Sequence, residues 1–426
     1  MKIRTIWLAV LVGLFLNAAA FAESKTTREL AQLAVSADSA VSTEAVKNLR
    51  ALGREGLDAL FQTYRSEIAE FSKTGEAGDE WKRIAAALDS VAMQRDAYAS
   101  QLFWFTDFEA AKREAARTNK PILSLRLLGN LNEEFSCANS RFFRALLYSN
   151  AEVSKYLREN YVLHWKSVRP APRVTIDFGD GRKIERTLTG NSIHYILDEN
   201  GAIIDAIPGL YSPPAFLKYL QSGVEINKVI DRAPKEQKEL LALRYRKTMF
   251  MDIKTNRDKS VGQSKVTLTE PKDGTGALDV MPRAMTKMIT EETILRGIYD
   301  NFARYEPQMN LDDWKKLSKL YAGAAKFDDS SVAFIKRQNA KTGLTDAEFA
   351  SLLSNLTNYV ALDTTRNDFL FHTKLYEMLN GSSPMDVDNF NSRVYAELFK
   401  TPDSDKWLGL YNTDVYTALD GNGIVK

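Results

Sequence analysis

Cys137 is the only cysteine in the chain of 426 residues, and it constrains the fold more than any other feature. A single thiol cannot form a disulfide within the chain, so we expect burial of apolar side chains to stabilise the fold. Hydrophobic residues make up 44% of the sequence, which is ordinary for a chain that can form such a core. Any thiol chemistry must therefore involve a partner molecule.

The first 22 residues have the pattern of an export signal. Lys2 and Arg4 form a short positive segment, the apolar run 6–16 follows, and Ala22 ends a stretch of small residues at which we expect cleavage. This run is shorter than the ~20 residues that a membrane-spanning helix needs, which disfavours the alternative of an uncleaved anchor. We therefore expect a periplasmic or extracellular protein with no stable membrane insertion after cleavage.

The charge of the mature chain argues against one class of partner. The signal segment holds two of the 57 basic residues and none of the 55 acidic ones, so the mature chain balances 55 against 55. No dense basic tract interrupts this balance. A neutral chain without such a tract is not expected to bind nucleic acid.

The spacing of apolar residues divides the rest of the chain into four parts. Residues 23–103 show three- and four-residue spacing, which predicts a helical N-terminal region, and the stretch TEAVKNLRALGREGLDALFQTY within it resembles one HEAT-like helix pair. Residues 104–222 alternate between helical and strand patterns. Residues 223–292 are predicted to be a linker and an extended loop, and residues 293–426 a helical C-terminal domain.

The alternating region predicts a single sheet with helices between its strands. Its order is helix, strand, helix, strand, hairpin and helix, with strands expected at ILSLRLL, YVLHWKSV, IHYILD and AIIDAI. A helix crosses between the first two strands, so we expect them to be parallel. Glycine-containing turns at 179–181 and 199–201 predict two hairpins, the first of which looks like an insertion.

This order resembles the thioredoxin superfamily, and the segments DFEAAKREAARTNKPILSLRL and VSKYLRENYVLHW are closest to exported thioredoxin-related proteins. The resemblance covers residues 104–222. It implies an α/β thioredoxin-like central domain flanked by mainly α-helical N- and C-terminal regions. The redox members carry Cys-x-x-Cys at the start of a helix, whereas this chain has Cys137 and Ser140 at the corresponding positions. That departure disfavours dithiol oxidoreductase activity.

The resemblance places Cys137 at a helix N-terminus, where unpaired N–H groups and the helix dipole stabilise a thiolate. Arg141 would add positive charge on the same helical face, and Ser140 could donate a hydrogen bond to the sulfur. The alternative is a buried and inert cysteine, which behaves as a small apolar residue.

The family's cis-proline belongs just before IHYILD, and Asn191, Ser192 and Ile193 occupy that stretch here. The resemblance implies that these three residues and His194 border the thiol, where His194 would take the thiol proton and the other three would contact the substrate. The period of two along the strand gives an alternative. It places His194 and Ile196 on one face and Ile193 on the other, and the histidine then points away from the thiol.

No metal or cofactor is expected. The chain has three dispersed histidines and one cysteine, which do not form the cluster that a metal site needs. No nucleotide-binding loop or hydrolase motif is present.

Three functions remain open, and whether the protein is an enzyme stays undecided among them. The first is a monothiol thioredoxin-like protein that engages the thiols or disulfides of a partner protein or a small thiol through Cys137. The second is a non-catalytic binding or scaffold protein of the envelope. The third is a transferase or hydrolase with Cys137 as its nucleophile.

Overall fold

The computed structural model describes residues 25–187, 191–264, 311–381, 385–399 and 401–407, together with positions 266, 418, 419 and 424. The predicted export signal at 1–22 lies outside these residues. So do positions 265 and 267–292 of the predicted linker and loop, and positions 293–310 of the predicted C-terminal helical domain.

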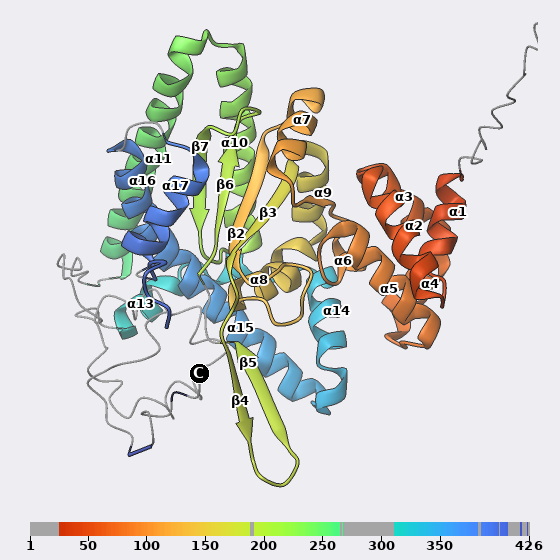
Figure 1. Cartoon of the computed structure of the whole chain (residues 1–426). Coiled ribbons are helices and arrows are strands. Elements are labelled where there is room, and N and C mark those ends of the chain that lie inside the picture. Colours follow the sequence, from red (N-terminus) through yellow and green to blue (C-terminus); the bar gives the residue numbers. More distant parts are fainter. Residues whose placement is uncertain are drawn as a thin grey trace, which may run out of the picture.

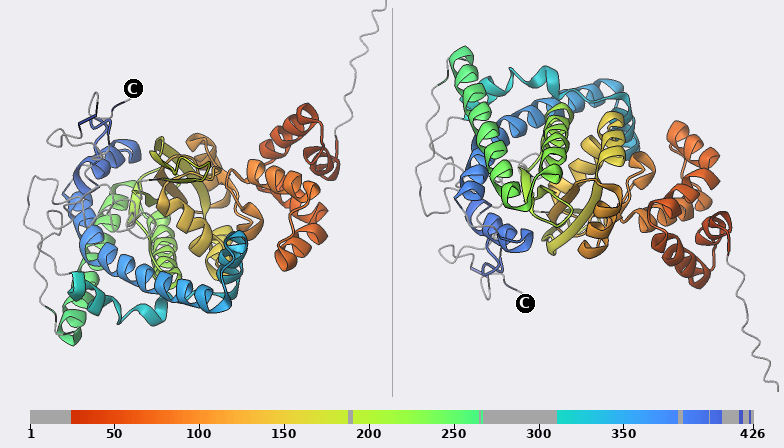
Figure 2. Two further views of the ribbon diagram at one scale, coloured as in Figure 1. Left: turned by 90° about the horizontal axis from the view of Figure 1, so that it is seen from below. Right: turned by 90° about the horizontal axis from the view of Figure 1, so that it is seen from above.

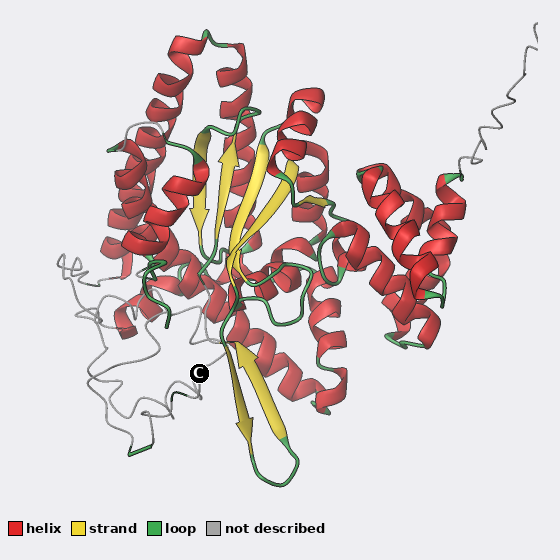
Figure 3. Ribbon diagram, in the orientation of Figure 1, coloured by secondary structure: helices red, strands yellow, loops and turns green. Residues whose placement is uncertain are grey.

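The N-terminal region is helical, and it forms a lobe with its own core beside the rest of the molecule (Figures 1 and 3). Its helices are α1 (Thr27–Ala34), α2 (Ser39–Ala51), α3 (Arg54–Thr63), α4 (Arg65–Thr74), α5 (Asp79–Ala92) and α6 (Ala97–Ser100). Leu49, Leu57 and Leu88 are fully buried between them. On α2, α3 and α5 the buried residues lie at helical spacing, so each of these helices turns one apolar face toward the core of the lobe.

The central region contains a five-stranded mixed sheet. The strands are β1 (Trp104–Phe105), β2 (Ile122–Leu128), β3 (Val162–Arg169), β6 (Ile193–Leu197) and β7 (Ile203–Pro208), in the order β1-β3-β2-β6-β7. β2 pairs with β3 in parallel, as the sequence predicts, and β6 is antiparallel to both β2 and β7. Every residue of β2 is buried, as its five apolar residues lead one to expect, and the burial includes the polar Ser124 and the charged Arg126.

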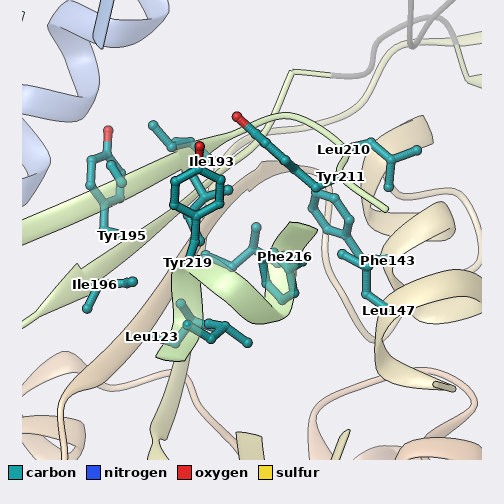
Figure 4. Packing of buried hydrophobic residues seen from close by; sticks show 14 of the residues in the cluster. Leu123, Phe143, Leu147, Ile193, Tyr195, Ile196, Leu210, Tyr211, Phe216 and Tyr219 are labelled. Carbon is teal, nitrogen blue, oxygen red and sulfur yellow. The ribbon is translucent and has the colours of Figure 1, made fainter. Parts of the chain in front are cut away.

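Helices cover both faces of this sheet. Helix α7 (Phe108–Thr118) packs on β3, and the Phe108 ring lies 5.1 Å from the ring of His164. The other face is covered by η1 (Phe143–Tyr148), α9 (Ala151–Asn160) and α10 (Pro213–Arg232). Figure 4 shows this second layer, in which Leu123 and Ile196 of the sheet belong to the same buried cluster as Phe216.

The C-terminal helices share this core and do not form a separate domain with a core of its own. Figure 2 shows them wrapped around the sheet. They are α13 (Leu311–Ser318), α14 (Asp329–Gln338), α15 (Asp346–Arg366), η7 (Asn367–His372), α16 (Thr373–Asn380), α17 (Val387–Arg393) and η8 (Val394–Leu398). Helix α17 packs on the face that α7 covers, where the Tyr195 hydroxyl donates to Asn391 Oδ1 at 3.1 Å. The last described helices therefore pack on the sheet.

The prediction of a linker from residue 223 is wrong. Helix α10 continues to Arg232, and α11 (Lys235–Ser264) follows after a two-residue turn at 233–234. The many charged residues of α11 suggested an exposed loop, but the helix buries Ala242, Met249 and Ile253 while most of its charged residues face solvent. Helix α11 packs against α16 and α10.

The first predicted hairpin forms a two-stranded sheet of its own, which projects from the molecule (Figure 1). Its strands are β4 (Arg173–Asp177) and β5 (Lys183–Thr187). Gly179 and Gly181 have φ values of 76° and 92°, in the left-handed region that glycine adopts readily. Within the described ranges, no helix is both long enough and apolar enough to cross a bilayer.

Candidate functional site

Cys137 is the N-cap residue of the short helix α8 (Ala138–Phe142), as the resemblance implied, and it is fully buried. Its backbone N–H donates to the carbonyl of Leu128 at 3.0 Å, which ties it to the end of β2. The thiol donates to Ser140 Oγ at 3.4 Å. The Ser140 hydroxyl lies 2.8 Å from the Cys137 carbonyl and 2.7 Å from Ser136 Oγ, so it finds acceptors other than the sulfur.

Two distant segments are bonded to residues that lie near Cys137 in the sequence or in the sheet. From the hairpin, Thr187 accepts a bond of 2.8 Å from Arg141 and donates to the Ser136 carbonyl at 3.3 Å. From the C-terminal segment, the Tyr395 hydroxyl donates to the Asn191 carbonyl at 3.0 Å. Burial raises the pKa of Tyr395 well above 10, and the nearby Cys137 raises it further. Cys137 itself is fully buried, and Arg141 bonds to the hairpin residue Thr187.

The three residues expected to contact a substrate are buried. Asn191 is 3% exposed and its amide donates to Thr401 at 3.2 Å. Ser192 is fully buried, and its hydroxyl has no hydrogen-bond partner among the described groups. Ile193 begins β6 and lies between Arg126 and Pro208 in the sheet. Asn191 and Ile193 therefore contact other residues of this chain, although the sequence predicted that they contact a substrate.

His194 does not pair with the thiol. Its Nε2 lies 2.7 Å from the Tyr148 hydroxyl, and its ring lies 4.6 Å from that of Phe143 and 5.0 Å from that of Phe216. Burial lowers the pKa of His194 to about 3, so the ring is neutral at any physiological pH. In the pairing of β6 with β2, His194 lies opposite Leu125 and Ile193 opposite Arg126, so these two side chains point to opposite faces of the sheet. A thiolate–imidazolium pair is therefore not formed.

A charged group that sequence reasoning missed lies on the α7 and α17 face of the sheet. Arg126 is 1% exposed, and its Nη2 donates to Asp388 Oδ1 at 2.9 Å. The other carboxylate oxygen accepts a bond of 2.7 Å from Lys166. The buried Ser124 hydroxyl lies 2.8 Å from His164 Nδ1 and accepts a bond from Arg126 at 2.5 Å. This group fixes α17 to the sheet.

A second buried polar group surrounds His372. The imidazole lies 3.6 Å from Asp205 Oδ1 and 3.9 Å from Asp368 Oδ1. Burial alone lowers the pKa of His372, but the two carboxylates outweigh it and raise the pKa above 6.5. The Tyr245 hydroxyl donates to Asp205 at 2.7 Å, and the Tyr219 hydroxyl donates to Asp368. This group connects β7 with α10, α11 and the C-terminal helices.

One cavity is lined by residues other than Cys137. It is a cleft of 1570 Å³ between the N-terminal lobe, the helix that follows Cys137, and helices α14 and α15. Phe71, Trp81 and Tyr98 form an aromatic group at its N-terminal wall, with the rings of Phe71 and Trp81 stacked at 4.0 Å. Arg144 approaches from η1, and Arg337 approaches from α14.

Basic side chains outnumber acidic ones in this cleft. Eight basic residues line it: Lys73, Lys82, Arg95, Arg141, Arg144, Lys336, Arg337 and Lys341. Four acidic residues line it: Asp89, Asp96, Glu134 and Glu348. One of these acids is neutralised in part, because burial raises the pKa of Asp89 to about 7. The cleft therefore carries a positive excess.

Three non-glycine residues near the cleft have left-handed backbone conformations. Met93, Asp96 and Gln101 have φ values of 53°, 60° and 57°. The surrounding structure holds this segment in place: Trp165 donates to the Met93 carbonyl at 2.8 Å, and the Arg95 N–H donates to the Leu131 carbonyl at 3.1 Å. Such strain persists only where neighbouring contacts enforce it, and it is frequent at binding sites.

Sequence patterns gave no signal for this cleft, because its walls come from three segments far apart in the chain. Among the described residues, no three His, Cys, Asp or Glu side chains are grouped so as to hold a metal ion. No protein-family model, no curated protein and no solved structure matches this chain.

Proposed function

We propose that this chain is an exported, non-catalytic binding protein with a thioredoxin-like core, and that it binds its partner in the cleft and not at the thiol. The strand order β1-β3-β2-β6-β7, with a cysteine at the N-cap of the helix after β2, supports the thioredoxin-like assignment. The signal pattern at 1–22 supports export to the periplasm or beyond.

The burial of Cys137 carries this proposal. Thiol–disulfide exchange requires the sulfur to attack a disulfide directly, so a redox thiol must be reachable. Cys137 is fully buried, and bonds from Tyr395 and Arg141 hold the segments that cover it. A nucleophile that acts with a base has no support either, because His194 is bonded to Tyr148.

The cleft supports binding in two ways. Its volume of 1570 Å³ exceeds the 300–1,000 Å³ that is typical of small-molecule sites, which favours a polymer or a segment of another protein. Aromatic and arginine side chains, which are enriched where proteins bind one another, lie together on its walls.

Alkylation of the thiol tests this proposal. We expect iodoacetamide to leave Cys137 unmodified in the native protein between pH 6 and 9 and to modify it fully in guanidinium chloride. The matched control is Cys137→Ser combined with Ser66→Cys, because Ser66 is exposed on α4 and its replacement should react at once. Rapid labelling of native Cys137 below pH 7 would instead support the monothiol function.

The monothiol function remains a second candidate because Cys137 occupies the N-cap of the helix that follows β2. It requires the segment around Tyr395 to move. A Tyr395→Ala variant loses the bond to Asn191 and should expose the thiol if that segment is a cover. If this variant labels rapidly and forms mixed disulfides with oxidised glutathione, the partner is a thiol or disulfide; if it stays inert, the thiol is structural.

A further inference from the structure

We infer that the cleft takes an acidic segment of a partner polypeptide, an inference that rests on the proposed binding function. Eight basic residues face four acidic ones there, although the mature chain as a whole is neutral. A local excess of one charge in a concave site attracts and selects partners of the opposite charge. The occupant is therefore anionic.

Arg144 provides a built position for a carboxylate. It is 5% exposed, and it has no ion pair with any described carboxylate at bonding distance. Its Nη1 donates to the Glu133 carbonyl at 2.9 Å, while its Nε has no hydrogen-bond partner among the described atoms. The charges of Asp96, Asp89 and Glu134 also act on this guanidinium. A buried guanidinium with an unpaired N–H lacks part of its bonding, and a carboxylate supplies it.

Arg337 of α14 provides a second position in the cleft. Its guanidinium lies 5.7 Å from the centre of the Tyr98 ring, and its Nη1 donates to the Ser72 carbonyl at 3.1 Å. Its Nε is also buried and without a partner in the described part of the chain. These contacts hold the guanidinium in place before any ligand arrives, which reduces the entropy lost on binding.

The apolar part of the lining favours a peptide over a polyphosphate or a nucleic acid. Phe71, Trp81 and Tyr98 form one apolar surface, and Leu352 and Leu356 of α15 form another. A polyphosphate has nothing to place against these surfaces, whereas a peptide with alternating acidic and apolar side chains fills both kinds of position. The size of the cleft accommodates such an extended segment.

Fluorescence anisotropy with labelled octapeptides tests the inference on the full mature protein. The probe alternates Glu with Phe or Leu, and two matched peptides replace every Glu with Gln or with Lys. We expect the Glu peptide to bind at least about tenfold more tightly than the Gln peptide, and the Lys peptide not to bind, because the attraction is electrostatic. Binding should weaken as salt is raised from 50 to 300 mM.

Variants locate the binding site. Arg144→Gln and Arg337→Gln should each weaken binding of the Glu peptide by about tenfold, as expected for charged groups at the centre of an interface. Arg186→Gln, on the exposed face of the hairpin outside the cleft, should change it by less than twofold. Because Arg144 is buried, its variant is checked by thermal melting, and the partly exposed Arg337 gives a second reading that does not depend on folding at that site.

Three outcomes would overturn the inference. The first is equal binding of the Glu and Gln peptides, the second is tighter binding of inorganic polyphosphate than of the Glu peptide, and the third is failure of every peptide to bind. None of these depends on the thiol. The proposed function fails instead if native Cys137 is reactive, so the two failures are distinguishable.

Discussion

The hydroxyl of Tyr148 lies 2.7 Å from Nε2 of His194, and both groups are fully buried. Burial lowers the pKa of His194 to about 3 and raises the pKa of Tyr148 well above 10, so a neutral ring and a neutral phenol share this bond. The histidine expected to activate the thiol instead joins η1 to β6.

This bond predicts a measurable coupling between the two residues. Tyr148→Phe leaves His194 without any hydrogen-bond partner, because Nδ1 has none among the described groups, and should cost about 1–3 kcal/mol in the free energy of unfolding. His194→Leu leaves the buried Tyr148 hydroxyl without its partner and should lower the free energy of unfolding by a similar amount. The double variant should lose less than the sum, because both polar groups are gone. Urea denaturation measures all three, with Tyr156→Phe as a partly exposed control; strictly additive losses would contradict the coupling.

The pair of Arg126 and Asp388 should stabilise the packing of α17. Asp388→Asn leaves the buried Arg126 guanidinium without its carboxylate, and we expect a loss of about 1–3 kcal/mol, moderated because the Asp388 side chain is 50% exposed. Lys166 contacts the same carboxylate but is 54% exposed, so Lys166→Met should change stability by less than about 0.5 kcal/mol. Equal losses in denaturation experiments would show that the burial of Arg126 does not matter.

Asp89 should make the N-terminal lobe less stable at alkaline pH. Burial raises its pKa to about 7 in the folded state, whereas an unfolded aspartate titrates near 3.8. The folded protein therefore holds a proton that the unfolded chain has lost, and stability falls as pH rises from about 4 to above 7. The shift corresponds to ~4 kcal/mol at most, and partial exposure to the cleft reduces this to about 1–3 kcal/mol.

Asp89→Asn tests this dependence because the amide oxygen can still accept the bond from the Ala97 N–H. The variant should be more stable than the wild type at pH 8 and similar to it at pH 4. Glu44→Gln, an exposed change in the same lobe, should leave the pH profile of thermal unfolding unaltered. If Asp89→Asn showed the same dependence of thermal stability on pH as the wild type, Asp89 would not be the group that causes it.

His372 should act in a different pH range. Asp205 and Asp368 raise its pKa above 6.5 despite burial, so its charged form stabilises the folded state. That contribution is complete below pH 6.5 and is lost as pH rises through the raised pKa. The loss of stability caused by His372→Gln should therefore be larger at pH 6 than at pH 9.

His164 provides the opposite case. Burial, and after it the charge of Arg126, lowers the pKa of His164 to about 3. Below pH 6.5 the unfolded chain binds a proton at His164 that the folded protein does not bind, and this lowers the stability of the wild type. The loss in the free energy of unfolding caused by His164→Gln should therefore be smaller at pH 4 than at pH 7. Denaturation of the His372→Gln and His164→Gln variants across pH 4–9 measures the stability that each loses relative to the wild type. If both losses changed in the same direction with pH, this account would be wrong.

The sequence alone determined the elements whose signals are local. The mainly apolar run at Ile122–Leu128 predicted a buried strand, and the glycines at 179 and 181 predicted the hairpin turn. The period of two placed His194 and Ile193 on opposite faces of the sheet. Each of these depends on residues a few positions apart. The sequence also suggested that Cys137 begins a helix, which the structure has.

The tertiary structure decided what covers each face. Tyr395 contacts Asn191 and Asp388 contacts Arg126 across more than 200 residues of chain. Periodicity shows that a face is apolar, but it does not show which distant segment buries it. The state of the thiol and the existence of the cleft depend on those distant pairings, because exposure is a property of the packed chain and not of any one segment.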